Sequence, residues 1–209
     1  MSIDLKSLGY LDLLNRKCNV KPNKAIQMGN LDIYLCPKCA TNTVRYASYK
    51  FDGGDQDIPD VRDLTKSDYN ILSMGPDSIL NYKEERSDSI KVAIKRDPVK
   101  RFVSALAWYN YKYGDIEKTV EKETVDLALL KTPDDIHFFP QTIFYGDDPS
   151  KYDHIIYIDD LRNLIYKETQ VDVGIIHKGK ADLVYETLSE EQKIKVMKLY
   201  KMDYDNGYY

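Results

Sequence analysis

The sequence has few cysteines, histidines and tryptophans, and it has no long apolar run. Its 209 residues include three cysteines, three histidines and one tryptophan. No apolar stretch approaches the ~18 residues that a membrane-spanning helix requires, so we expect no transmembrane helix. The N-terminal residues lack a basic start followed by an apolar segment, which is the pattern of a secretion signal. We therefore expect a cytoplasmic protein with no membrane partner.

The scarcity of cysteine also limits the kinds of site that the chain can build. Three cysteines, Cys18, Cys36 and Cys39, are a poor count for a disulfide framework. A structural zinc site needs four ligands, and the C-x-x-C pair Cys36/Cys39 offers two of them. Cys18 and a histidine could complete such a set, but no second C-x-x-C and no H-x-x-x-H is present. We therefore expect no metal site.

The charge is acidic overall but locally basic. The formal net charge of −4 disfavours a general nucleic-acid-binding protein, which needs a basic surface. Residues 36–50, the first basic island, contain Lys38, Arg45 and Lys50 and no acid. Residues 91–101, the second basic island, hold five bases against the single acid Asp97. An acidic protein with two such islands predicts a small anionic ligand and no nucleic-acid partner.

Short β-prone runs alternate with helical patterns along the chain. Strands are predicted at Leu31–Cys36, Lys91–Lys95 and His154–Ile158. Helices are predicted after each strand, and a final helix is predicted from the capping box of Ser189 and Gln192. The alternation predicts one α/β domain over residues 1–209, with a mainly parallel sheet flanked by helices. The charged stretch Asp115–Lys131 is expected to be helical.

A predicted strand leads into each basic island, with Leu31–Cys36 ending where the first island begins and Lys91–Lys95 opening the second. Asp97 and Pro98 suit the N-cap and the first position of a helix that begins within the second island, after the strand. Ligands of α/β sheets lie at the carboxyl ends of the strands. Pro37–Thr43 and Arg96–Ser104 are therefore expected to meet at one edge of the sheet and to form one site.

The residues after the first strand suit an anion-binding turn. Small residues at Cys39 and Ala40 would let an anion approach the backbone N–H groups of a helix N-terminus, and Lys38 would add a charge. The side chains of Thr41, Asn42 and Thr43 could donate further hydrogen bonds. The pattern G-x-x-x-x-G-K-[ST] is absent, however, and a capped helix with Lys38 in solvent explains the same residues.

The C-P-x-C at the predicted helix start also resembles the active-site segment of glutaredoxins, whose first cysteine has a lowered pKa. Glutaredoxins are about half as long as this chain, and no later Thr-Val-Pro type segment is present. A thiol–disulfide oxidoreductase using Cys36 and Cys39 therefore stays an alternative interpretation.

Taken together, the ordered motifs resemble the sulfotransferase superfamily, in the branch that contains carbohydrate sulfotransferases. Pro37–Asn42 is similar to the family's P-K-x-[GA]-[ST]-[ST] loop, and Arg96–Ser104 matches R-D-P-x-x-R-x-x-S, including Arg101. His137–Gln141 matches an H-[aromatic]-x-P-Q segment, and Ile155–Leu161 matches a strand followed by an acidic-Leu step. The residues from Leu188 resemble the closing L-S … L-Y … D-[YF] … G-Y pattern. Asn42 departs from the family, which has a hydroxyl residue there.

The resemblance implies a nucleotide-kinase-like fold and a sulfuryl donor, 3'-phosphoadenosine-5'-phosphosulfate, with no metal. It implies that the 5'-phosphosulfate is held by the loop, namely by Lys38, Cys39, Ala40, Thr41, Asn42 and Thr43. It implies that Arg96 and Ser104 hold the 3'-phosphate, with Arg101 as a further candidate. The acceptor would be a hydroxyl group, here on a carbohydrate. A non-catalytic nucleotide-binding module is a further alternative.

A hydroxyl acceptor needs a base, because its own pKa is far above neutral pH. His137 is the candidate, since histidine titrates near neutrality. A carboxylate within Asp52–Ser89 is the alternative base, and packing with Phe138 and Phe139 is the alternative role of His137. The C-terminal residues Tyr200, Asp203 and Tyr208 are interpreted as packing residues.

Overall fold

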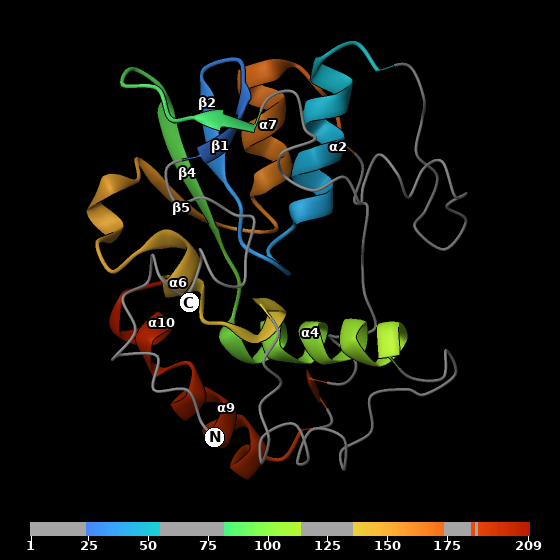
Figure 1. The fold of residues 1–209 in the computed structure, drawn as a ribbon, viewed down its shortest axis with the longest axis vertical. Coiled ribbons are helices and arrows are strands. Elements are labelled where there is room, and N and C mark those ends of the chain that lie inside the picture. The colour runs from blue at the N-terminus through green and yellow to red at the C-terminus, as the bar shows by residue number, and fades with distance from the viewer. Residues whose placement is uncertain (1–23, 55–81, 114–135, 174–184, 187) are drawn as a thin grey trace.

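The computed structural model describes residues 24–54, 82–113, 136–173, 185–186 and 188–209 (Figure 1). In this part of the chain, five strands form one sheet in the order β3-β1-β2-β4-β5. The strands are β1 (Lys24–Met28), β2 (Leu31–Tyr34), β3 (Tyr82–Glu84), β4 (Ile90–Lys95) and β5 (His154–Tyr157). The predicted strands at Leu31, Lys91 and His154 are confirmed as β2, β4 and β5.

The sheet is mixed rather than mainly parallel. β4 runs parallel to both β2 and β5, with Ile33 opposite Val92 and Ala93 opposite Ile155. β1 runs antiparallel to β2 and to β3. β1 and β2 are joined by a two-residue turn whose first residue, Gly29, has φ +54°, a conformation that glycine adopts readily. The expectation of a parallel sheet therefore holds only for the half formed by β2, β4 and β5.

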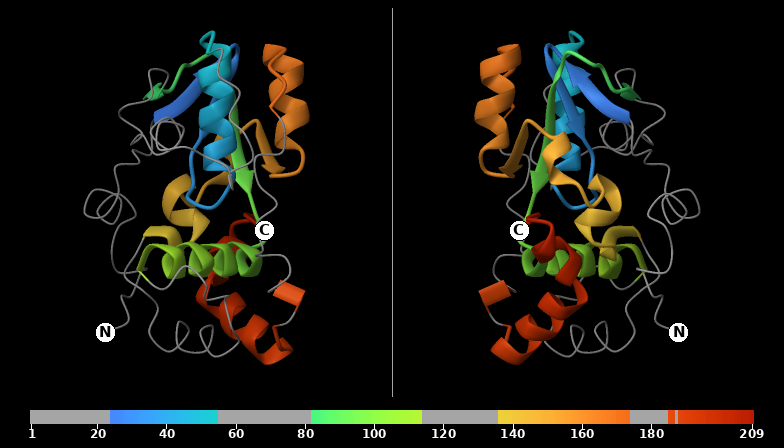
Figure 2. Two further views of the ribbon diagram at one scale, coloured as in Figure 1. Left: turned by 90° about the vertical axis from the view of Figure 1, so that its right-hand side faces the viewer. Right: turned by 90° about the vertical axis from the view of Figure 1, so that its left-hand side faces the viewer.

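The described helices flank the sheet or lie beyond its end. They are α2 (Thr41–Phe51), α4 (Pro98–Tyr113), η3 (Ile136–Phe138), α6 (Gln141–Tyr145), η4 (Pro149–Lys151), α7 (Leu161–Thr169), α9 (Glu190–Leu199) and α10 (Lys201–Asp205). α2 and α7 run alongside the sheet, whereas α4, α9 and α10 lie beyond the end at which β4 finishes (Figures 1 and 2). The predicted helix at Asp115–Lys131 lies outside the described residues.

Two predicted helix starts are confirmed in detail. The Asp97 carboxylate accepts a hydrogen bond from the Lys100 backbone N–H at 2.8 Å, with Pro98 as the first residue of α4. At α9 both halves of the capping box form between Ser189 and Gln192. Caps of this kind satisfy N–H groups that the helix itself leaves without partners, so they fix where α4 and α9 begin.

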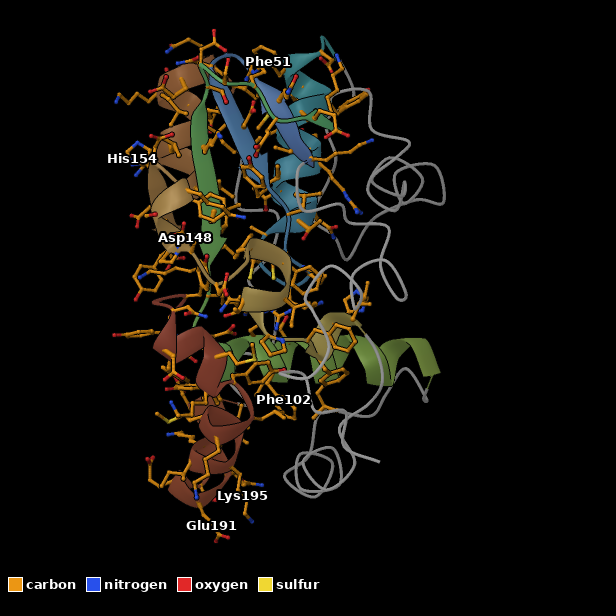
Figure 3. The ribbon with its side chains drawn as sticks, turned by 60° about the vertical axis from the view of Figure 1, so that its left-hand side comes forward. Phe51, Phe102, Asp148, His154, Glu191 and Lys195 are labelled. Atoms are coloured by element: carbon orange, nitrogen blue, oxygen red, sulfur yellow. The ribbon has the colours of Figure 1, made fainter. Side chains whose placement is uncertain are left out.

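The apolar interior has two parts. The larger part packs around the sheet, where the central strands β2 and β4 bury Ile33, Val92 and Ile94 completely. The smaller part joins α4 to the C-terminal helices through Phe102, which Figure 3 labels on α4. The Phe102 ring meets those of Phe138 and Tyr200 in edge-on contacts. Of the described helices, none is long and apolar enough to cross a membrane.

Candidate functional site

The segment Cys36-Pro37-Lys38-Cys39 forms a tight turn directly after β2. The Cys39 N–H donates to the Cys36 carbonyl at 3.1 Å, and Lys38, the third residue, has φ +68°. Proline second and a positive φ third are the features of a type II turn, in which glycine is usual at the third position. A lysine in this left-handed conformation costs roughly 1 kcal/mol. Backbone strain of this kind clusters at active sites and ligand-binding sites.

Helix α2 begins immediately after this turn without a side-chain cap. Ala40 occupies the N-cap position with φ +54°, and no side chain accepts a hydrogen bond from the first turn. The Thr41 hydroxyl instead donates to the Cys36 carbonyl at 2.9 Å, which ties the helix start to the end of the strand. The N–H groups of the first turn have no acceptor within the helix, and the helix dipole makes this end positive. The predicted strand, turn and helix N-terminus are therefore present.

The second basic island meets this turn. Arg96 follows β4, and its Nη1 donates to the Lys38 carbonyl at 3.0 Å. β2 and β4 are parallel neighbours, so their carboxyl ends deliver Lys38 and Arg96 to the same place. The expectation that the two islands lie together is confirmed.

The Lys38 ammonium group lies in a positive environment. The side chain is partly buried, and within the described residues its Nζ takes part in no salt bridge and no hydrogen bond. Burial, and then the nearby guanidinium groups of Arg96 and Arg101, lower the pKa of Lys38 to about 8. A positive charge so placed favours the binding of an anion, because an anion would relieve both the desolvation and the repulsion.

Arg101 lies in the interior of the protein. Its side chain is fully buried, with Nε donating to the Pro37 carbonyl at 3.0 Å and Nη1 donating to the Phe139 carbonyl at 2.6 Å. Its guanidinium group also lies 6.0 Å from the centre of the Tyr200 ring. Arg101 therefore holds the turn against the segment that contains Phe139, while its buried Nη2 has no hydrogen-bond partner among the described residues.

Gln141, the last residue of the H-[aromatic]-x-P-Q segment, connects the turn to the second island. Its side chain is fully buried. Oε1 accepts from the Arg96 N–H at 2.9 Å and from the Cys39 thiol at 3.3 Å. Nε2 donates to the Arg96 carbonyl at 2.9 Å and to the Tyr208 carbonyl at 2.7 Å. The motif was visible in the sequence, but the function of its glutamine was not.

Asp203 holds Gln141 in place from the C-terminal side. Its carboxylate accepts from the backbone N–H groups of Gln141 at 2.9 Å and Thr142 at 2.8 Å, and from the Thr142 hydroxyl at 3.0 Å. Burial raises the pKa of Asp203, and Arg101 and these hydrogen bonds oppose that shift. Asp203 therefore binds the start of α6 to α10, so its interpretation as a simple packing residue was incomplete.

The two cysteines are buried free thiols within the turn. Cys36 and Cys39 are 0% and 1% exposed. Burial raises the pKa of Cys36. Burial acts in the same direction on Cys39, but the contact with the Cys36 thiol and the guanidinium groups of Arg101 and Arg96 lower the pKa of Cys39 overall. No group of three or more His, Cys, Asp or Glu residues suited to a metal ion occurs in the described part of the chain.

The other predicted site residues lie at different distances from the turn. Asn42 and Thr43 are partly buried in the first turn of α2. His137 is partly buried in η3, two residues before Phe139. Arg101 donates hydrogen bonds both to the Phe139 carbonyl and to the Pro37 carbonyl in the turn. Ser104 is partly buried on α4, about 9 Å along the helix axis from the first residue. The geometry therefore joins Lys38 and Arg96 directly and places His137 beside a segment bound to the same turn.

The chain matches no protein-family model, no curated protein and no solved structure. The function is therefore inferred from the motifs and from the geometry of the residues themselves.

Proposed function

We propose that the protein is a sulfotransferase, which moves a sulfuryl group from 3'-phosphoadenosine-5'-phosphosulfate to an acceptor hydroxyl, with a carbohydrate as the acceptor class. The observation that carries the proposal is the contact between Arg96 and Lys38 at the carboxyl ends of two neighbouring parallel strands. Two anion-binding segments meet there, and the Lys38 ammonium has no counterion among the described residues. A donor with phosphate groups at both ends suits such a pair.

The strand, turn and helix formed by β2, Cys36–Cys39 and α2 support the nucleotide-kinase-like arrangement that the motifs imply. In this arrangement the Lys38 ammonium and the N–H groups of residues 40–43 would surround the 5'-phosphosulfate. Lys38 would neutralise the charge that develops on the leaving 5'-phosphate as the sulfur–oxygen bond breaks. Arg96 and Ser104 would hold the 3'-phosphate and so align the donor with the acceptor.

The acceptor hydroxyl would lose its proton to His137 as its oxygen attacks sulfur. The position of His137 near the Arg101-bound Phe139 supports this assignment, because that segment adjoins the turn. A carboxylate within Asp52–Ser89 is the alternative base. The transferred sulfuryl group carries less charge than a phosphoryl group, so the proposal requires no metal ion.

The two alternatives have less support from the geometry. An exchanging thiol must be reached by the disulfide that it attacks, and Cys36 and Cys39 are buried. A Cys36→Ala variant that lost all activity would nevertheless favour the oxidoreductase. A non-catalytic nucleotide-binding module would bind the donor without turnover on any acceptor.

The test is binding of adenosine 3',5'-bisphosphate, the product of the donor, measured by isothermal titration calorimetry. We expect wild-type protein to bind, and Lys38→Ala and Arg96→Ala each to weaken binding by about 100-fold, as the loss of a charged phosphate contact does. Lys50→Ala is the matched control, since Lys50 lies in the last turn of α2, at the other end of the helix. Labelled-sulfate transfer from the donor to a panel of glycans then tests catalysis. Wild-type protein that fails to bind the nucleotide would contradict the proposal.

A further inference from the structure

Gln141 joins three segments that are far apart in the sequence. One side-chain amide contacts the Cys39 thiol in the turn, both backbone groups of Arg96, and the Tyr208 carbonyl near the C-terminus. The side chain is fully buried. A buried amide with every donor and acceptor engaged is rigid, because rotating it would leave several buried polar groups without partners.

The contacts form a closed circuit around the two anion-binding segments. Gln141 pairs with the N–H and the C=O of Arg96 at 2.9 Å each, as a neighbouring strand would. The same Oε1 accepts from Cys39, and Arg96 Nη1 returns to the carbonyl of Lys38. The circuit fixes the backbone of Arg96 relative to the backbone of the turn.

The amide itself is anchored from a third direction. Asp203 accepts from the Gln141 backbone N–H, and Tyr208 accepts from its Nε2. The carbonyls of Arg96 and Tyr208 both require a donor, and only Nε2 of the side-chain amide can donate. The amide nitrogen and oxygen can therefore be placed in only one of their two orientations. One residue with no exposed surface therefore contacts both basic segments, in addition to the pairing of β2 with β4 and the Arg96–Lys38 hydrogen bond.

We infer that Gln141 is a positioning residue, which sets the spacing between the turn at Lys38 and Arg96 and thereby selects ligands with two phosphate groups at that spacing. The inference rests on the proposed function. The inference extends the proposed function in one respect. It assigns the preference for a nucleoside bisphosphate over either monophosphate to a residue that does not touch the ligand.

The physical reason is the advantage of a ligand that engages two sites at once. Once one phosphate is bound, the second binds at a high effective concentration, but only if the two sites lie at the right distance. Displacing one site affects a bridging ligand strongly and a ligand of one site weakly. Two linked contacts raise affinity by roughly 100-fold or more over a single contact, and this gain is lost when the geometry no longer allows both.

The experiment compares three ligands on wild-type protein and Gln141→Met, which keeps the side-chain volume and removes the amide. The ligands are adenosine 3',5'-bisphosphate, adenosine 5'-monophosphate and adenosine 3'-monophosphate, with dissociation constants measured by calorimetry. We expect the bisphosphate to lose about 100-fold in affinity, the gain that two simultaneous contacts provide. Each monophosphate should lose less than about 3-fold, since independent sites respond separately.

Thr142→Val is the matched control. It removes the Thr142 hydroxyl contact with Asp203 and leaves the Gln141 side chain intact. We expect a lower melting temperature and an unchanged ratio of bisphosphate to monophosphate affinity. A structural perturbation of this region alone would therefore be separated from a change in spacing.

Equal losses for all three ligands in Gln141→Met would overturn the positioning role and leave the proposed function intact. Wild-type protein that bound none of the ligands would overturn the proposed function and this inference with it. If Gln141→Met shows no cooperative thermal transition, Gln141→Asn replaces it, because its amide is one methylene too short to complete the circuit. The same unequal loss is then expected, and equal losses would again overturn the role.

Discussion

Charged side chains have different surroundings at the two ends of the parallel strands. At the amino end, the buried carboxylate of Asp32 on β2 accepts from the Arg86 backbone N–H at 2.8 Å and from Nε at 2.9 Å, and forms a 2.6 Å salt bridge with Nη2. Asp153, before β5, similarly accepts from the Lys91 N–H at 2.8 Å. At the carboxyl end, Lys38, Arg96 and Arg101 lie close enough for the two guanidinium groups to lower the pKa of Lys38.

The difference separates the charges that stabilise the fold from those that suit a ligand. A buried carboxylate with a guanidinium partner and several hydrogen bonds is satisfied within the protein. An ammonium group near two other cations is not satisfied in this way, and a bound anion would stabilise its charged form. The same sheet therefore has a closed electrostatic end and an end that favours an anionic ligand.

The largest expected effect on stability comes from removing the buried carboxylate of Asp32 at the amino end of the parallel strands. Asp32→Ala removes the carboxylate and leaves the Arg86 backbone N–H and Nε without their acceptor, whereas Nη1 and Nη2 still donate to the carbonyls of Gly29 and Leu31. We expect the free energy of unfolding to fall by about 3 kcal/mol. Urea denaturation measures the change. The control is Asp172→Ala, which removes the exposed Arg162–Asp172 pair and should cost less than about 1 kcal/mol. Equal costs for the two variants would show that burial of Asp32 adds nothing.

The charge at the other end can be tested by pH. The pKa of Lys38 is about 8 without ligand, and a bound phosphate would raise it, so binding takes up a proton above pH 8. Affinity for adenosine 3',5'-bisphosphate should then fall by up to about tenfold per pH unit above pH 8. Lys38→Arg stays charged over this range and should lose this dependence. Parallel profiles for the two proteins, measured by calorimetry, would contradict the assignment.

The same pKa also predicts the stability of the ligand-free protein. The folded pKa lies below the ordinary lysine value of 10.5, so between about pH 8 and that value the unfolded chain binds more protons than the folded one. The contribution of Lys38 to the free energy of unfolding is therefore unfavourable at or below pH 8 and improves as the pH rises. Lys38→Arg should lack this rise in chemical denaturation.

The smallest expected effect concerns the backbone of the turn. Lys38→Gly and Lys38→Ala both remove the ammonium group, but only glycine adopts φ +68° without strain. Lys38→Gly should therefore be more stable than Lys38→Ala by about 1 kcal/mol in urea denaturation. Lys50 lies in the last turn of α2, where the order should reverse, with Lys50→Gly the less stable of its pair. Lys38→Ala as stable as Lys38→Gly would argue against the left-handed conformation.

Local patterns predicted the parts of the fold that depend on local chemistry. Runs of β-prone residues identified β2, β4 and β5, and Asp97 with Pro98 identified the start of α4. The meeting of Lys38 and Arg96 followed from a general rule, that the carboxyl ends of parallel neighbours share one edge. These features need no knowledge of which distant segments touch.

The missed features depend on contacts between distant segments. β1 and β3 lie on one side of the sheet, and they take their structure from antiparallel partners. The burial of Arg101 follows from its contacts with Pro37 and Phe139, and the function of Gln141 from Cys39, Arg96 and Tyr208. A residue's neighbours in the sequence do not reveal such partners, so the motif pointed to these residues without explaining them.

The contact between Gln141 and the Tyr208 carbonyl has a consequence for synthesis of the protein. A ribosome makes the turn at Lys38 and the helix after Arg96 well before it makes residue 208. During that interval the Gln141 amide lacks the Tyr208 carbonyl as a hydrogen-bond acceptor. The spacing that we assign to Gln141 is then less constrained. The two basic segments of a nascent chain therefore lack one of the contacts that hold them together until the C-terminal residues dock, among the last steps of folding.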